Sequence, residues 1–245
     1  MYQKTLKNLV SDAKPVEPFE QLEAKRLSRP DPNSECTLCG RCARACSGRA
    51  IVISEGRWSV DLGRCVFCRD CYDICEHISS VPAPHYALRR EDLVFLAGES
   101  RDVEGQLPRE KTKAVRGSVA IRELDTGSCN ACESEANARG NKYYDMERFG
   151  IKVTPSPRHA DALLVTGPMT RNMLVAAQKT YDAVPNPKLV VACGTCAISG
   201  GLFVTGDVVG EGISDTLPAD IFVVGCPPTP NGMIVSLIKA LGLRH

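Results

Sequence analysis

The chain repeats one cysteine pattern twice, and this repeat limits the folds that are open to its N-terminal third. In each copy, three cysteines are separated by two residues, and a fourth follows after three more residues. Thiols at such short spacing wrap a compact metal centre in a tight loop. The eight cysteines are Cys36, Cys39, Cys42 and Cys46 in the first copy, and Cys65, Cys68, Cys71 and Cys75 in the second.

This spacing is typical of bacterial-type ferredoxins, which hold two [4Fe–4S] clusters. In that arrangement three ligands come from one run and the fourth comes from the other run. We therefore predict one cluster on Cys36, Cys39, Cys42 and Cys75, and another on Cys65, Cys68, Cys71 and Cys46. Ser47 and Glu76 follow the fourth cysteines, where ferredoxins usually have proline. This departure affects the local loop shape rather than the ligation.

Zinc sites and disulfides are the alternative uses of these cysteines. Zinc sites usually have two paired motifs, not two triplets that each carry a trailing fourth cysteine. The first ten residues lack an apolar core and a small-residue cleavage site, so we expect no secretory signal and reduced thiols. The formal net charge of +1 does not indicate a nucleic-acid partner. No run of about 18 apolar residues exists that could span a membrane.

Composition divides the chain into four parts. Residues 1–30 are charged and mixed, and we expect an extended arm. Residues 31–98 form an α+β ferredoxin domain, in which a turn at 54–57 joins a predicted hairpin. Residues 99–117 are polar and charged, as in a linker. Residues 118–245 form the second domain.

The second domain alternates short apolar runs with helix-like stretches. The runs lie at 119–121, 163–165, 189–191 and 221–224, and a Gly, Thr or Cys residue follows each of them within five positions. Helix-like stretches at 172–181 and 232–241 lie between or after them. The pattern predicts an α/β fold with a parallel sheet covered on both faces. Ligands gather at the carboxyl ends of the strands in such sheets.

Five cysteines follow three of these runs, at the predicted ligand-binding edge. Four of them could complete a third [4Fe–4S] cluster. Cys193 ends an apolar strand and is expected to be a buried, small apolar residue. Cys196 lies in a glycine-bounded loop, where the backbone can approach a cluster. We therefore predict that the ligands are Cys129, Cys132, Cys196 and Cys226.

Four segments of the second domain resemble the small subunit of [NiFe] hydrogenases and its relative in respiratory complex I. They are DTGSCNACE, ADALLVTGPMT, GTCAISGG and GCPPTP, in the order found in that family. The resemblance implies a flavodoxin-like fold that carries one cluster beside a large subunit. The first domain, with the segment RREDL at 89–93, is similar to the two-cluster ferredoxin subunits of the same complexes. Cys129 and Cys132 are separated by two residues, as in the membrane-bound, energy-converting and formate hydrogenlyase branch, which often has Gly where this chain has Ala131.

The resemblance implies an electron-transfer subunit with three [4Fe–4S] clusters and no catalytic site of its own. Its partners would be a large [NiFe]-hydrogenase-like catalytic subunit, membrane-arm subunits, and a module that donates or accepts electrons. The chain would be cytoplasmic and peripheral to the membrane. Two alternatives stay open: a complex I-related quinone or other-acceptor oxidoreductase that lacks the [NiFe] site, and a redox-inert iron–sulfur assembly module.

Glu133 and Glu135 follow the first ligand loop of the second domain. One of them could carry protons or contact the large subunit, but acids are also common in the first turn of a helix. The strand at 163–165 and the one before the ligand loop belong to the same sheet. We therefore expect both glutamates and the turn at 166–170 to lie near the large-subunit interface.

Overall fold

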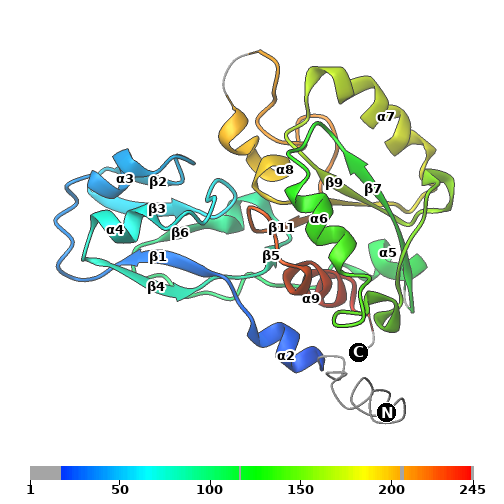
Figure 1. Cartoon of the computed structure of the whole chain (residues 1–245), viewed down its shortest axis with the longest axis horizontal. Helices are drawn as coiled ribbons and strands as arrows, with labels where there is room; N and C mark the ends of the chain where they lie inside the picture. Colours follow the sequence, from blue (N-terminus) through cyan, green and yellow to red (C-terminus); the bar gives the residue numbers. More distant parts are fainter. Residues whose placement is uncertain (1–17, 116, 205–206, 244–245) are drawn as a thin grey trace, which may run out of the picture.

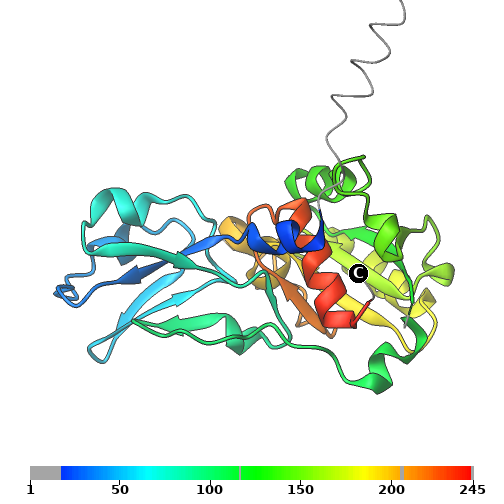
Figure 2. The same cartoon turned by 90° about the horizontal axis from the view of Figure 1, so that it is seen from below.

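The computed structural model of the chain describes residues 18–115, 117–204 and 207–243. Two lobes lie side by side along the long axis of the molecule (Figures 1 and 2). The N-terminal lobe contains both cysteine repeats, and the C-terminal lobe contains a large sheet with helices on both faces.

The N-terminal lobe has two small antiparallel sheets and two short helices. Strands β1 (Ser28–Pro32) and β4 (Ile78–Pro82) form one sheet. Strands β2 (Ile51–Ser54), β3 (Arg57–Asp61) and β6 (Val94–Leu96) form the other sheet. Helices α3 (Arg41–Ala45) and α4 (Asp70–Ile74) pack against each other. The predicted hairpin is confirmed, because β2 and β3 pair around Glu55 and Gly56, whose φ angles of 52° and 70° suit a tight hairpin turn.

The C-terminal lobe is built on a six-stranded sheet in the order β5-β11-β10-β9-β7-β8. Five strands are parallel, and only β5 runs antiparallel to its neighbour β11. This arrangement confirms the predicted mixed α/β fold with a mostly parallel sheet. The strands are β5 (Tyr86–Ala87), β7 (Val119–Asp125), β8 (Ile151–Val153), β9 (Ala162–Thr166), β10 (Leu189–Cys193) and β11 (Ile221–Val223).

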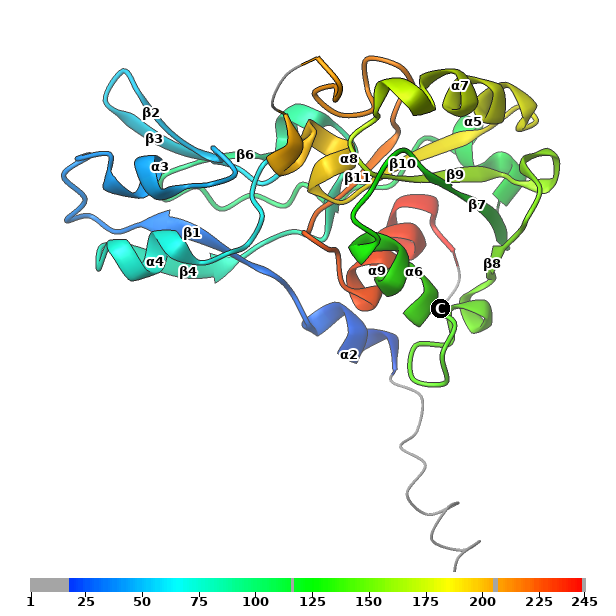
Figure 3. The same ribbon diagram turned by 45° about the horizontal axis from the view of Figure 1, so that its top comes forward.

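Helices cover both faces of this sheet, because successive residues of each buried strand point to opposite sides (Figure 3). Ala162 and Leu164 of β9 pack with helix α9 (Pro230–Leu241), beside helix α6 (Ala131–Ala138). Leu163 and Val165 pack in the core that includes helices α7 (Leu174–Ala183) and α8 (Thr195–Ser199). The remaining helical turns are the 3₁₀ segments η1 (Arg90–Leu93), η2 (Lys113–Val115), η3 (Met146–Phe149), η4 (Pro157–His159), η5 (Arg171–Met173) and η6 (Gly201–Phe203).

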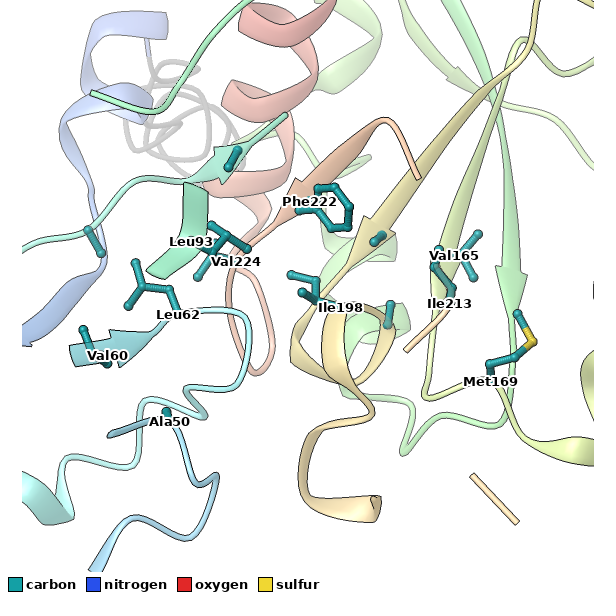
Figure 4. Close-up of a cluster of buried hydrophobic side chains, with 14 of the residues drawn as sticks. Ala50, Val60, Leu62, Leu93, Val165, Met169, Ile198, Ile213, Phe222 and Val224 are labelled. Carbon is teal, nitrogen blue, oxygen red and sulfur yellow. The ribbon is translucent and has the colours of Figure 1, made fainter. Parts of the chain in front are cut away.

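The two lobes share one apolar core. Leu62 and Leu93 of the N-terminal lobe belong to the same buried cluster as Ile198, Phe222 and Val224 of the C-terminal lobe (Figure 4). Strand β5, which precedes the last strand of the N-terminal lobe in sequence, is an edge strand of the large sheet. The boundaries proposed at residues 98 and 118 therefore stay predictions for two lobes that pack as one unit.

The expectation of an extended arm does not describe residues 18–30. Helix α2 (Phe19–Ala24) buries Phe19 and Leu22 and packs on α9, so apolar burial orders this segment. Residues 1–17 lie outside the described part of the chain. The expected linker is also packed where it is described. It contains helix α5 (Arg109–Thr112), and the side chain of Glu104 is only 1% exposed.

Within the described residues, none of the helices combines the length and the apolar character that a membrane crossing requires.

Candidate functional site

One backbone geometry recurs at three Cys-x-x-Cys segments. The residue after the first cysteine has a left-handed φ, namely 77° at Gly40, 75° at Arg69 and 65° at Asn130. A helix begins at the next residue in each case, at the start of α3, α4 and α6. The second cysteine therefore lies in the first helical turn, where free N–H groups favour negative charge. A left-handed conformation is uncommon for a residue with a side chain, so Arg69 is held by the surrounding loop.

Cys39 illustrates the effect of this geometry on a thiol. The backbone N–H of Arg41, followed by its side chain, lowers the pKa of Cys39 to about 7. The thiolate is the form that binds metals, so this loop favours the ligating state. Cys42 and Cys75 are buried. The pKa of Arg41 is raised mainly by its side-chain hydrogen bond to Cys39, and the charges of Cys39 and Cys75 contribute as well. Cys75 of the second run therefore lies within electrostatic reach of the first run.

A cavity of about 170 Å³ lies in the N-terminal lobe, and four predicted ligands form part of its wall. Three of them come from the second cysteine run and one comes from the first run. They are Cys65, Cys68, Cys71 and Cys46. The cavity therefore combines thiols in the crossed pattern that the repeat predicts.

The thiols around this cavity influence one another. Burial, together with the charges of Cys46, Cys71 and Cys68, raises the pKa of Cys65 to about 12. Burial and the same kind of repulsion raise the pKa of Cys71 to about 11. Iron ions would reverse this balance, because a bound cation stabilises coordinating thiolates. The four thiols of the cavity wall are of the type that would bind iron as thiolates.

The third group of thiols lies at the carboxyl edge of the large sheet. Cys129 and Cys132 follow β7, Cys196 follows β10, and Cys226 follows β11. The loops are joined by backbone hydrogen bonds, from Gly194 N to Val223 O and from Thr195 N to Gly225 O, both at 2.9 Å.

These four thiols also affect one another electrostatically. Burial, together with the charges of Cys226 and Cys129, raises the pKa of Cys196 to about 12. Burial likewise raises the pKa of Cys132, with contributions from Cys193, Cys196 and Cys226. The predicted ligands of the third site therefore lie in one electrostatic neighbourhood.

Two glycines keep the space beside these sulfurs open. A Cβ atom on Gly194 would lie 2.7 Å from the Cys132 sulfur, and one on Gly201 would lie 2.8 Å from the Cys196 sulfur. Both residues also have positive φ angles, 88° and 59°. Any side chain would collide with a thiol, so glycine permits the close approach of backbone to sulfur that the sequence suggests.

Cys193 differs from the other cysteines of the sheet edge. It ends β10, has no exposed surface, and packs in the core between the sheet and helix α9. Burial raises its pKa to about 12. It is buried among apolar residues, as the strand pattern predicts.

Glu133 lies in the first turn of α6 and accepts a hydrogen bond from the hydroxyl of Thr166. Its other carboxylate oxygen is buried without a hydrogen-bond partner. Glu133 thus connects the first ligand loop to the turn at 166–170. Glu135, two residues further along α6, is half-buried. Their place at an interface stays a prediction.

Sequence reasoning missed two buried residues near these thiols. Thr195 precedes Cys196, and its hydroxyl donates to the carbonyl of Cys65, 130 residues away. The hydroxyl residue before a candidate ligand in Gly-Thr-Cys was the available signal. Arg139 is 1% exposed, and its charge lowers the pKa of Cys193, although burial dominates that pKa. Nothing in the sequence around Arg139 distinguishes it from a surface arginine.

Across the described residues, no three Cys, His, Asp or Glu side chains converge closely enough to hold a single metal ion. A four-iron cube spreads its four thiolates over the corners of a larger body. Thiols grouped around a cavity suit such a body.

The fold and these thiols define a class of chain: a mixed α/β protein with cysteine ligand candidates at one sheet edge and in a cysteine-rich lobe. The family described as NADH ubiquinone oxidoreductase, 20 Kd subunit, matches residues 129–240. The chain belongs to this family, which includes the hydrogenase-type subunits that the four sequence segments resemble. The match begins at Cys129, the first predicted ligand of the third site, so both N-terminal cysteine runs lie outside it.

Three relatives illustrate the breadth of the family. Formate hydrogenlyase subunit 7 of Escherichia coli is 43% identical, over 54% of this chain and 51% of that protein. The probable membrane-bound hydrogenase subunit mbhJ of Pyrococcus furiosus is 40% identical, over 53% of this chain and 77% of that protein. An NADH-quinone oxidoreductase subunit of Geobacter metallireducens is 45% identical, over 44% of this chain and 63% of that protein. The chain thus spans about half the length of the first relative.

Proposed function

We propose that the chain is an electron-transfer subunit that holds three [4Fe–4S] clusters. The N-terminal lobe would be a two-cluster ferredoxin domain, and the C-terminal lobe would be a flavodoxin-like domain with the third cluster. The observation that carries this proposal is the cavity of about 170 Å³, whose wall combines Cys46 of the first run with Cys65, Cys68 and Cys71 of the second. Two unrelated uses of cysteine, as disulfides or as zinc ligands, do not require this crossed arrangement.

A bound [4Fe–4S] cluster accepts and returns single electrons at a potential that the protein tunes through burial and hydrogen bonds to sulfur. The chain's own residues would supply that environment. At the start of α3, the backbone N–H of Arg41 favours the thiolate form of Cys39. Gly194 and Gly201 leave room for backbone beside the sulfurs of the third site.

The relatives support a proposal for the partners and the location. Two of the relatives are named as subunits of formate hydrogenlyase and of a membrane-bound hydrogenase. By this likeness, the third centre would face a large [NiFe]-bearing subunit, with Glu133, Glu135 and the 166–170 turn near the interface. The N-terminal centres would face the donor or acceptor module, and the chain would be peripheral to a membrane arm on the cytoplasmic side.

A second candidate function is a relay subunit in a quinone-linked or other oxidoreductase that lacks nickel. The identity of 45% with a subunit of an NADH-quinone oxidoreductase favours it. Purification of the native complex separates the two. Nickel together with hydrogen-dependent dye reduction supports the hydrogenase type, and the absence of both from an active complex supports the second type.

The relay is tested by Cys226→Ala in the native complex. The two N-terminal centres should remain reducible, because their ligands lie in the other lobe, while electron flow to the large subunit should stop. Electron paramagnetic resonance would follow each centre, alongside turnover from the donor to the large subunit. Wild-type turnover in a complex that demonstrably lacks the third centre would reject this order.

A further inference from the structure

Helix α8 connects the two lobes at the point where two of the proposed centres approach each other. Its first residue, Thr195, is 1% exposed. The Thr195 hydroxyl lies 2.9 Å from the carbonyl oxygen of Cys65 and 3.1 Å from that of Gly225. Its backbone N–H donates to Gly225 O at 2.9 Å. A hydroxyl has one proton and donates to one carbonyl at a time, and the shorter distance favours Cys65.

The residues that Thr195 touches are proposed ligands or their immediate neighbours. Cys65 belongs to the N-terminal centre beside the cavity. Gly225 directly precedes Cys226, and Thr195 itself directly precedes Cys196. Both of these cysteines are proposed ligands of the third centre. One buried side chain therefore joins the ligand backbones of two centres in different lobes.

The same contact distinguishes between the two N-terminal centres. Cys65 is assigned to the centre with Cys46, Cys68 and Cys71, whereas the other centre takes Cys75 and the first run. Helix α8 meets the N-terminal lobe at Cys65 and again at Gly63, whose carbonyl accepts a hydrogen bond from Ser199 at 2.8 Å. The Cys65 centre is therefore the neighbour of the third centre.

We propose that Thr195 is a positioning residue that couples the Cys65 centre to the third centre for electron transfer. The inference rests on the proposed function. In the step, one electron leaves the Cys65 centre, which is oxidised, and reaches the third centre, which is reduced. The Thr195 proton stays on its oxygen, and no bond is made or broken.

The physical reason is that the hydrogen bond provides a continuous path of close contacts between the two ligand loops. A hydrogen bond brings donor and acceptor atoms closer than a van der Waals contact does, and electronic coupling falls steeply with the width of each gap. Burial keeps water from competing for the Cys65 carbonyl. Removal of the hydroxyl would widen the gap between residue 195 and the Cys65 carbonyl. It would also remove a contact that fixes the distance between the two ligand loops.

The test uses four variants of the full chain. Thr195→Val keeps the side-chain shape without the hydroxyl, and Thr195→Ala is a second hydroxyl-free variant. Thr195→Ser restores the hydroxyl. Ser199→Ala is the comparison variant, because it removes a hydrogen bond from the same helix to Gly63 of the same lobe and leaves the Thr195–Cys65 contact in place, although the Ser199 hydroxyl also lies 3.1 Å from the Thr195 carbonyl.

Each variant is reduced by a photogenerated one-electron dye, and rapid-freeze electron paramagnetic resonance follows the electron between centres. Cys226→Ala identifies the signal of the third centre. We expect both hydroxyl-free variants to retain three centres and to transfer the electron several-fold more slowly than wild type. Thr195→Ser and Ser199→Ala should transfer at the wild-type rate.

Several results would overturn the inference while the proposed function stands. The first is a wild-type transfer rate in Thr195→Val, and the second is an equal loss of rate in Ser199→Ala. The third is loss of the third centre in both hydroxyl-free variants, which would show that the hydroxyl stabilises the cluster site rather than the electron transfer. Absence of three centres from the wild-type chain would instead reject the proposed function, and the inference with it.

Discussion

Cys193 and Cys196 are three residues apart, yet they enter different environments. Cys193 ends β10 and is sealed in the core beside α9, whereas Cys196 lies in α8 among the other thiols of the sheet edge. The strand-end position of Cys193 and the glycines around Cys196 predict this difference from sequence.

Paired substitutions at these positions test the third site. Cys193→Ala should keep the third centre and lose about 1 kcal/mol of stability, since it removes one small buried group. Cys196→Ala should lose or distort the centre, because it removes a thiolate ligand. Iron content and electron paramagnetic resonance of the two variants provide the readout. If Cys193→Ala were the variant without the third centre, the assignment of the loop would be reversed.

Other residues could not be predicted from their sequence neighbours. Thr195 meets Cys65 across 130 positions, and Arg139 is buried by the packing of α6 rather than by any local pattern. The Thr195 contact depends on how the two lobes dock, and the burial of Arg139 depends on packing within the C-terminal lobe; no spacing or composition encodes either of them.

Helices α3 and α4 repeat one element in the N-terminal lobe. Each begins after a left-handed residue, and each ends at the fourth cysteine of its run, Cys46 or Cys75. The two helices pack together, which brings the two cysteine runs side by side, as the predicted crossed ligation requires.

Cys75→Ala tests this crossing directly. It should disturb the centre held by Cys36, Cys39 and Cys42, although Cys75 belongs to the second run. Cys46→Ala is the matched variant and should disturb the centre of Cys65, Cys68 and Cys71. Spectra of the two centres would distinguish them. Disturbance of the centre within the same run would indicate local rather than crossed ligation.

A charge network around the buried Glu104 ties helix α2 and the 99–107 segment to α9. The Glu104 carboxylate contacts Arg26 and Lys239 and accepts from the backbone N–H of His85. Lys239 also pairs with Glu23 of α2 at 2.7 Å. Ion pairs and apolar burial therefore hold residues that we expected to form an arm and a linker. Their mixed composition gave no indication of this packing.

His85 makes the stability of this region depend on pH. Burial lowers its pKa, as do the charges of Arg26 and Lys239, while Glu104 opposes the shift. Since the folded pKa lies below the unfolded value of about 6.5, the unfolded chain binds the proton first as the pH falls. Stability is therefore present above about pH 6.5 and decreases below it.

The expected result is a fall in the thermal unfolding midpoint between about pH 7 and about pH 5.5. His85→Gln should reduce the slope of that fall, and His159→Gln, at an exposed position, should leave it unchanged. Anaerobic thermal scans of the cluster-loaded chain would measure all three proteins. Identical slopes in wild type and His85→Gln would show that His85 does not control this dependence.

At the scale of the whole molecule, the sequence predicts the α/β sheet well and the relation between the lobes poorly. The strands β7, β9, β10 and β11 were predictable because each contains a short apolar run. The edge strand β5 was not, because its two residues lie beyond the cysteine runs and gain strand structure only by pairing with β11. The shared core around Leu62, Ile198 and Val224 likewise arises from docking (Figure 4).

The central claim is that twelve thiolates in two packed lobes hold three four-iron centres. The most direct test is the iron and acid-labile sulfide content of the full chain, reconstituted anaerobically to saturation. The account predicts about twelve irons and about twelve sulfides per chain, four of each from every centre. Saturation near eight irons would contradict it by removing one centre.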